Sequence, residues 1–121
     1  MKRLTQQEED VMLVLWQLGK GFVKDILEQY PEPRPPYTTL ASTVKNLERK
    51  RYIEGRRYGN TFEYTPVINE RNYKKQFMSE VVKDYFSNSY SELVAFFARE
   101  QRISADELKE IVRIIEDSGV Q

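Results

Sequence analysis

Short polar and basic side chains recur at helical spacing just after a cluster of four prolines. The set comprises Thr38, Thr39, Ala41, Ser42, Lys45 and Arg49. Short side chains allow a close approach to DNA, where they can contact a thymine methyl group or hydrogen-bond a phosphate, and Lys45 can also reach a guanine. The chemistry that this spacing favours is binding rather than catalysis. The alternative is an ordinary solvated helix face.

A basic β-hairpin is predicted directly after this helix. Residues 52–57 and 61–65 have the pattern of antiparallel strands around a turn that contains Gly59 and Asn60. Arg56, Arg57 and Tyr58 lie at its tip, where they can contact backbone phosphates or the minor groove. A helix followed by a hairpin is the order of a winged-helix DNA reader, whose helix enters the major groove. The alternative is a basic tip that serves only as soluble surface.

Charge supports this interpretation only through its distribution. The chain has 121 residues, which is one domain or one small domain with an appendage, and its 19 basic and 19 acidic residues cancel. The segment 45–57 nevertheless carries six basic and two acidic residues. Positive charge is therefore concentrated where the predicted helix and hairpin meet.

The missing residue types exclude most catalytic chemistry. The chain has no cysteine and no histidine, which rules out disulfides, thiolate catalysis, zinc fingers and a histidine base. There is no phosphate-cradling glycine loop, and no acidic cluster has convincing spacing for a metal. We therefore expect no enzyme activity, no cofactor and no metal. Without an apolar leader or a stretch of 18 apolar residues, we also expect a cytoplasmic protein with no membrane insertion.

Helical patterning organises the first half of the chain. A capping box of Thr5 and Glu8 opens a helix over 5–18, and a second short helix is expected over 22–30, before the prolines. The third helix begins near Tyr37 and buries Leu40, Val44 and Leu47. We predict a mainly α fold with a small β-hairpin (α+β), with a winged helix-turn-helix DNA-binding domain over 1–68.

The remaining residues, 69–121, are predicted to form a helical dimerisation region. Tyr73, Phe77, Val81 and Tyr85 mark one helix, and capping boxes at Ser89 and Ser104 open two more. Three short helices bury too little apolar surface to form a stable core by themselves. We therefore expect them to pack against a second copy of the chain in a symmetric dimer. The alternative is that they fold back onto the first domain. The expected dimer contacts are Phe77, Val81, Leu93, Val94, Phe96, Phe97, Leu108, Ile111 and Ile115.

A set of short motifs also occurs in order along nearly the whole chain. These are Leu4-Thr-x-x-Glu8, Val11-Met-x-x-Leu15-Trp16, Val23-Lys-Asp-Ile26, Thr39-Leu-x-x-Thr43-Val, Leu47-x-x-Lys50-x-Tyr52-Ile, Gly59-x-x-Phe62-x-Tyr64-Thr-Pro66, Ser91-Glu-Leu-Val94, Phe97 and Ile103-Ser-x-x-Glu107-Leu. Together they resemble the penicillinase and methicillin-resistance repressor family. The resemblance implies a transcriptional repressor that binds palindromic operator DNA as a homodimer.

The resemblance also implies how repression is relieved. In better-known members a membrane-bound sensor metalloprotease triggers cleavage within the dimerisation region. The matching position lies near Ala95, and Phe96-Phe97 stands where those members carry Asn-Phe. The copper-responsive branch of the family uses a C-terminal cysteine cluster, which this chain lacks.

Two other functions remain open from the residues. A winged helix can serve purely in protein–protein assembly, and the zero net charge favours that alternative. A repressor could also bind a small molecule in an aromatic dimer interface, although no cluster of polar anchors points to one.

Overall fold

The computed structural model describes residues 3–118, and the chain divides into two compact units, Met1–Lys74 and Lys75–Gln121. Sequence patterning places the boundary between residues 68 and 69. In the structure Ile68 and Tyr73 still pack against the core of the first unit. The division therefore falls inside the helix that follows the hairpin.

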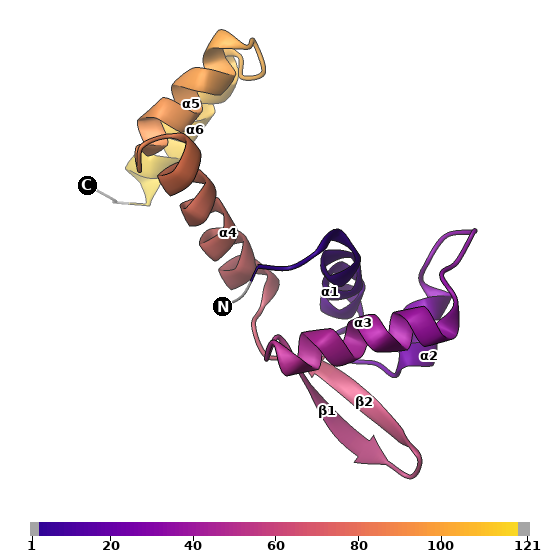
Figure 1. Cartoon of the computed structure of the whole chain (residues 1–121). Coiled ribbons are helices and arrows are strands. Elements are labelled where there is room, and N and C mark those ends of the chain that lie inside the picture. Colours follow the sequence, from indigo (N-terminus) through magenta and orange to yellow (C-terminus); the bar gives the residue numbers. More distant parts are fainter. Residues whose placement is uncertain (1–2, 119–121) are drawn as a thin grey trace. The chain divides into compact units, whose positions relative to one another are not determined.

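Three helices build most of the first unit: α1 (Gln6–Leu18), α2 (Val23–Glu28) and α3 (Tyr37–Arg49) (Figure 1). The predicted capping box opens α1, since Thr5 Oγ1 accepts from the Glu8 amide at 3.2 Å and Glu8 Oε1 accepts from the Thr5 amide at 2.8 Å. Gly19, at φ 83°, ends α1 in a backbone conformation that favours glycine. The sequence therefore fixes both ends of this helix locally.

Helix α2 is shorter than the predicted span of 22–30. The Phe22 amide donates to Asp25 Oδ2 at 3.0 Å, as the residue that caps a helix does. Phe22 is therefore the N-cap and lies outside the helix. At the other end the Tyr30 amide bonds to the Leu27 carbonyl, three residues back, and Pro31 follows. The tightened last turn and the proline end the helix before Tyr30.

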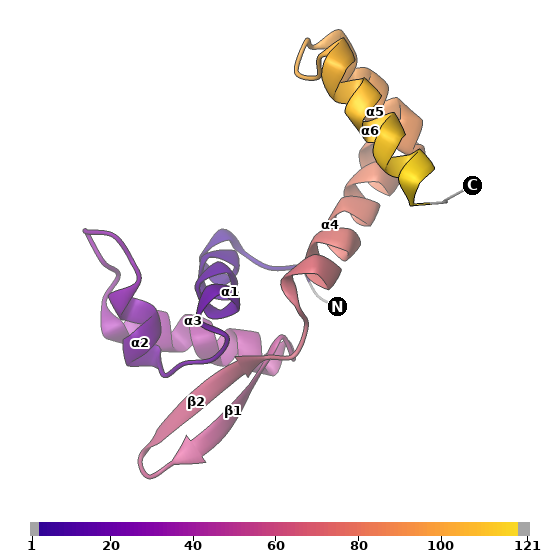
Figure 2. The same ribbon diagram turned by 180° about the vertical axis from the view of Figure 1, so that it is seen from behind.

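The predicted hairpin is present as β1 (Ile53–Tyr58) and β2 (Thr61–Pro66), which pair antiparallel (Figure 2). Ile53 lies opposite Pro66, and Tyr58 lies opposite Thr61. Only two residues connect the strands, and the first, Gly59, has φ 60°. A positive φ at this position suits the tight hairpin turns whose twist matches that of the strands.

The core of the first unit lies where the helices meet the base of the hairpin. As predicted, α3 buries Leu40, Val44 and Leu47. The other buried residues of this core are Val11, Met12, Leu15, Ile26, Tyr52, Ile53 and Tyr64. Gly21 exchanges two backbone hydrogen bonds with Tyr64, at 2.9 and 2.8 Å, and so ties the α1–α2 connection to β2. The core thus fixes how α3 sits on the hairpin.

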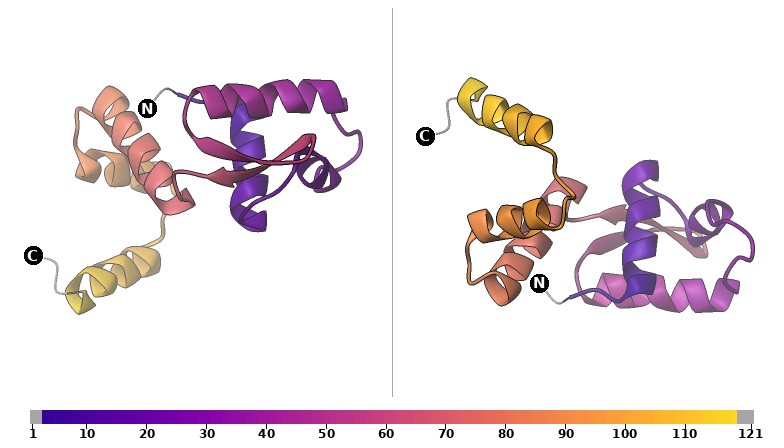
Figure 3. Two further views of the ribbon diagram at one scale, coloured as in Figure 1. Left: turned by 90° about the horizontal axis from the view of Figure 1, so that it is seen from below. Right: turned by 90° about the horizontal axis from the view of Figure 1, so that it is seen from above.

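The second unit contains most of α4 (Glu70–Tyr85), followed by α5 (Tyr90–Arg99) and α6 (Ala105–Asp117). The Ser104–Glu107 capping box is present, whereas at Ser89 the structure shows the serine half, with Ser89 Oγ accepting from the Glu92 amide. Figure 3 shows α6 standing apart from α4 and α5. Among the described residues of α5 and α6, none is fully buried.

Helix α4 contains Tyr73, Phe77, Val81 and Tyr85, as predicted, and its residues differ in exposure. Tyr85 is 74% exposed, and Val82 rather than Val81 is fully buried. A turn follows α4, in which Ser87 and Asn88 both have positive φ, and the Asn88 amide donates to the Val82 carbonyl at 3.0 Å. Helical periodicity alone does not predict this turn.

Candidate nucleic-acid interface

One face of α3 is free of the core and carries polar side chains. The buried stripe fixes the rotation of the helix, which leaves Thr38, Ser42 and Arg49 exposed on the opposite side, with Thr39 at the edge. Pro36 precedes the helix and accepts the Leu40 amide at 3.0 Å, so α3 begins immediately after the proline segment. The short hydroxyl side chains of Thr38, Thr39 and Ser42 are therefore exposed on a helix whose opposite face is buried in the core.

Ala41 and Lys45 lie toward the hairpin rather than at the centre of this face. Ala41 is half-buried. Lys45 Nζ lies 5.0 Å from the centroid of the Phe62 ring on β2 and 3.5 Å from Glu48 Oε1. Because 55% of the Lys45 side chain is exposed, its ammonium group remains accessible at the edge between helix and hairpin.

Asn46 belongs to the same exposed face, although the sequence analysis did not select it. Its Oδ1 accepts a hydrogen bond of 2.7 Å from Arg49 Nη1. The helical position, four residues after Ser42, is the signal that would have identified it. Asparagine is the side chain that pairs bidentately with adenine, and the Arg49 contact fixes which way the amide points.

The three wing residues are exposed and locally ordered. Arg56 lies 5.4 Å from the centroid of the Tyr58 ring, and Arg57 Nε donates to the Gly59 carbonyl at 2.9 Å. The Tyr58 ring also meets Phe22 edge to face, with centroids 5.9 Å apart. Each guanidinium group at the hairpin tip is therefore held in place by a neighbouring residue.

Lys50 points away from this surface. Its Nζ donates to Glu8 Oε1 at 2.7 Å and to the Arg3 carbonyl at 3.2 Å. Burial raises the pKa of Glu8, but hydrogen bonds from Lys50 and from the Thr5 amide outweigh burial and hold the pKa below its usual value. Lys50 therefore joins the end of α3 to the start of α1, whereas Arg49 stays on the exposed face and contacts Asn46.

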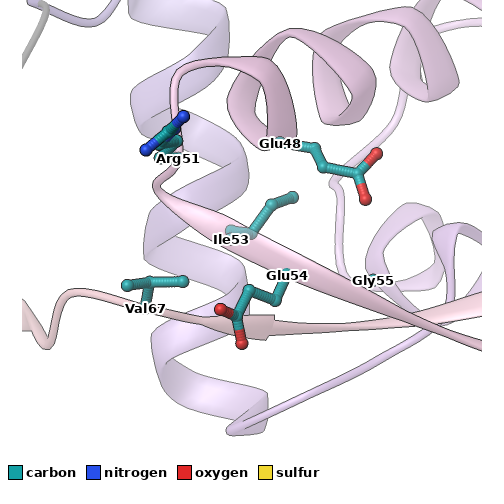
Figure 4. A pocket seen from close by; sticks show the side chains of 6 residues that line it. All are labelled: Glu48, Arg51, Ile53, Glu54, Gly55 and Val67. Atoms are coloured by element: carbon teal, nitrogen blue, oxygen red, sulfur yellow. The ribbon is translucent and has the colours of Figure 1, made fainter.

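The base of the hairpin forms an open pocket of about 570 Å³ beside α3 (Figure 4). Its lining includes the carboxylates of Glu48 and Glu54, with Ile53 and Val67 as apolar walls. At Gly55 an added Cβ would lie 2.8 Å from the Tyr64 ring and 2.9 Å from Glu48 Oε2. The glycine therefore permits the close approach of α3, β1 and β2. The lining of this pocket also includes Arg51, so it carries side chains of both charges.

The second unit exposes large apolar side chains. Phe96 and Phe97 are 45% and 40% exposed, and their rings meet edge to face at 5.4 Å. On α6, Ile111 and Ile115 are 43% and 48% exposed. The other expected dimer contacts are half-buried or at the edge of exposure: Phe77, Val81, Leu93, Val94 and Leu108.

The described residues offer neither a metal site nor a membrane-spanning helix. Within residues 3–118, no three or more acidic side chains gather in a way that could hold a metal ion. No helix in the same range is long and apolar enough to cross a membrane.

Comparison with known proteins decides the family. A family model described as penicillinase repressor matches residues 4–117. This chain belongs to the penicillinase repressor family. The methicillin resistance regulatory protein MecI of Mammaliicoccus sciuri is 20% identical over 113 residues, covering 93% of this chain and 92% of MecI. The penicillinase repressor of Bacillus licheniformis is 23% identical over 125 residues, covering 97% and 94% of the two chains.

A solved structure supports the fold independently. BpsR of Bordetella bronchiseptica, a protein whose DNA binding is regulated by 6-hydroxynicotinic acid, matches with a TM-score of 0.50 and 12% identity. The match covers 99% of this chain and 78% of that one. With its family and its winged-helix fold, this repressor is a DNA-binding transcriptional regulator, and its family is not one of enzymes.

Proposed function

We propose that this repressor binds palindromic operator DNA as a homodimer, with α3 in the major groove and the hairpin along the phosphates. The observation that carries the proposal is the exposed face of α3, where Ser42, Asn46 and Arg49 lie opposite the buried stripe. In this arrangement Thr38, Thr39 and Ala41 approach the bases, and Lys45 contacts a phosphate or a guanine at the helix edge.

The wing supplies the second set of contacts. Arg56, Arg57 and Tyr58 are exposed at the tip of a two-residue turn, and each arginine is already oriented by a neighbour. We assign these side chains to backbone phosphates or the minor groove. Contacts of this kind supply affinity through release of counterions and make binding dependent on salt.

The unpartnered apolar residues of the second unit support dimerisation. Four large apolar residues of α6 are exposed, namely Ile111, Val112, Ile114 and Ile115. Exposed patches of this kind are rare on soluble monomers and are typical of protein interfaces. A second copy would cover them by a symmetric contact and would place two α3 helices on the two halves of a palindrome.

The experiment for this proposal is fluorescence anisotropy of the full chain on DNA from upstream of its own gene, across a salt series with competitor DNA. Binding that survives competitor and weakens steeply with salt supports the operator complex. The alternative function, protein–protein assembly, would give weak binding that competitor abolishes. Sedimentation of the same samples measures whether the bound species is a dimer.

We further propose that cleavage in α5 relieves repression. Phe96 and Phe97 lie in the middle of α5 and are substantially exposed. A protease needs an extended substrate, so cleavage requires local opening of this helix, and loss of the dimer contacts would uncouple the two half-sites. The responsible enzyme would be a membrane-bound sensor protease, as the family resemblance implies.

Cells of the native host, treated with a cell-wall antibiotic, provide the test. Immunoblotting and mass spectrometry should show an N-terminal fragment ending near Phe96. The repressor remaining full-length while its target genes are induced would contradict proteolytic relief.

A further inference from the structure

A cluster of aromatic side chains joins α1 to the first turn of α4. The Tyr73 ring packs against Trp16 with centroids 5.4 Å apart, and meets Tyr52 edge to face at 6.0 Å. The Tyr73 hydroxyl donates to Glu9 Oε2 at 2.5 Å. Each of these contacts lies within the first unit, although α4 continues into the second.

The segment that leads into α4 is held at further points. Trp16 Nε1 donates to the Ile68 carbonyl at 2.9 Å, and Asn69 Oδ1 accepts from the Asn72 amide at 2.8 Å. The Tyr73 amide bonds to the Asn69 carbonyl at 3.0 Å. The connection between β2 and α4 is therefore not a free linker, because side chains of α1 and an asparagine cap fix it.

In the contact between Tyr73 and Glu9, the Tyr73 hydroxyl is the hydrogen-bond donor. Burial, followed by the hydrogen bond to Glu9, raises the pKa of Tyr73 above its usual value, so the phenol keeps its proton and remains a donor. Packing alone would tolerate some rotation of the ring. A hydrogen bond from the hydroxyl to a carboxylate on α1 restricts how the first turn of α4 is oriented.

We infer that Tyr73, Trp16 and Glu9 form a positioning joint, which fixes the start of α4 on the DNA-binding unit and so makes the dimer selective for the spacing of its half-sites. The inference rests on the dimer and operator proposed above. Two linked modules bind together best when their connection matches the span between sites, and a stiff connection loses more affinity than a loose one when that span changes.

The test uses the full chain on an operator fragment defined by footprinting. Affinity is measured for the natural spacing, for spacings changed by one or two base pairs, and for a single half-site. Each added base pair rotates and displaces one half-site relative to the other. The spacing ratio is the affinity for the natural operator divided by that for the altered one.

Removing the hydroxyl should loosen the joint. We expect Tyr73→Phe to reduce the spacing ratio by about tenfold, in line with the loss of one hydrogen bond to a charged group. Half-site affinity and dimer formation should not change. Tyr85→Phe is the matched control, because it removes the same atom from an exposed tyrosine on the same helix, and it should leave the ratio unchanged.

The partner carboxylate gives an independent measurement. Glu9→Ala should reduce the ratio as Tyr73→Phe does, whereas Glu9→Gln, which keeps an acceptor, should retain most of it. The double variant should lose little more than either single change, because both remove one contact. If Tyr73→Phe does not fold, as judged by Trp16 fluorescence, the Glu9 pair carries the test.

The outcomes separate the two levels of the proposal. A wild-type chain that is monomeric or binds DNA without specificity contradicts the proposed function itself. A wild-type dimer that discriminates spacing, with Tyr73→Phe and Glu9→Ala discriminating equally well, overturns the joint and leaves the operator complex intact. A fall in half-site affinity equal to the fall on the full operator would also overturn it, because the defect would then lie within the DNA-binding unit.

Discussion

Lys50 Nζ lies 2.7 Å from Glu8 Oε1. This contact distinguishes Lys50 from Arg49, the basic residue beside it at the end of α3. Lys50 contacts the start of α1, whereas Arg49 remains on the exposed face with Asn46. A basic cluster that looks uniform in the sequence therefore has two roles. Lys50 fastens the end of α3 to the start of α1, and Arg49 is the residue that we propose contacts DNA.

The Glu8–Lys50 pair should make stability depend on pH. The folded pKa of Glu8 is lowered from 4.5, so the pair stabilises the fold above that unfolded value, and this contribution is lost as pH falls through the folded value. Glu8→Gln should cost about 1–3 kcal/mol near neutral pH, and its difference from wild type should shrink at acid pH. Urea unfolding followed by Trp16 fluorescence at several pH values measures this. A difference that is constant down to about pH 3 would contradict it.

Arg49 and Lys50 should differ in DNA binding. Arg49→Ala should weaken binding to all sequences and reduce the slope of log affinity against log salt by about 0.9 if the guanidinium contacts one phosphate. Lys50→Met should leave that slope unchanged and instead lower the free energy of unfolding. Anisotropy titrations over a salt series provide both slopes. Equal slopes for the two variants would mean that the assignment is wrong.

Asn46 should contribute to sequence specificity. Its amide is oriented by the 2.7 Å contact with Arg49, as suits a direct base contact. Asn46→Ala should weaken operator binding about tenfold or more while leaving non-specific binding unchanged, because one base pairing is worth about 1–3 kcal/mol of discrimination. Parallel titrations on operator and on random DNA make the measurement. A proportional loss on both would assign Asn46 to general affinity.

Gly55→Ala should destabilise the first unit. The added Cβ would lie 2.8 Å from the buried Tyr64 ring, so the helix or a strand must shift, at a cost of about 1–3 kcal/mol. Gly21→Ala is the control, because its nearest new contact is 3.4 Å and needs little movement. Urea midpoints of the two variants provide the comparison. Equal midpoints would show that the hairpin base adapts freely.

Ile111→Glu should break the proposed dimer. The side chain is 43% exposed in the single chain and lies on the apolar face of α6, where a second copy would have to bury the new charge. Sedimentation velocity should show the dimer dissociation constant rising at least about a hundredfold. Lys109→Glu, a change to the same residue on the same helix, should have little effect. Similar dissociation by both variants would point to general damage of α6.

Much of the fold could be predicted from the sequence, because its signals are local. The capping boxes of Thr5 and Ser104, the apolar spacing within α3 and the turn at Gly59 each depend on residues within a few positions of one another. The family could be predicted for a related reason: the order of many short motifs is retained along the chain. Caps, apolar spacing and turn residues therefore favour these elements through short-range interactions.

Tertiary structure decided how neighbouring residues with similar chemistry are used. Sequence spacing does not predict that Lys50 contacts Glu8 while Arg49 stays exposed. Nor does it predict that Lys45 lies over Phe62, or that Tyr73 contacts Trp16 and Glu9. Each of these contacts joins elements that lie far apart in the chain. The sequence alone determined which elements form and which face of α3 is polar. Packing determined which polar groups are held by a distant partner, as Lys50 is by Glu8.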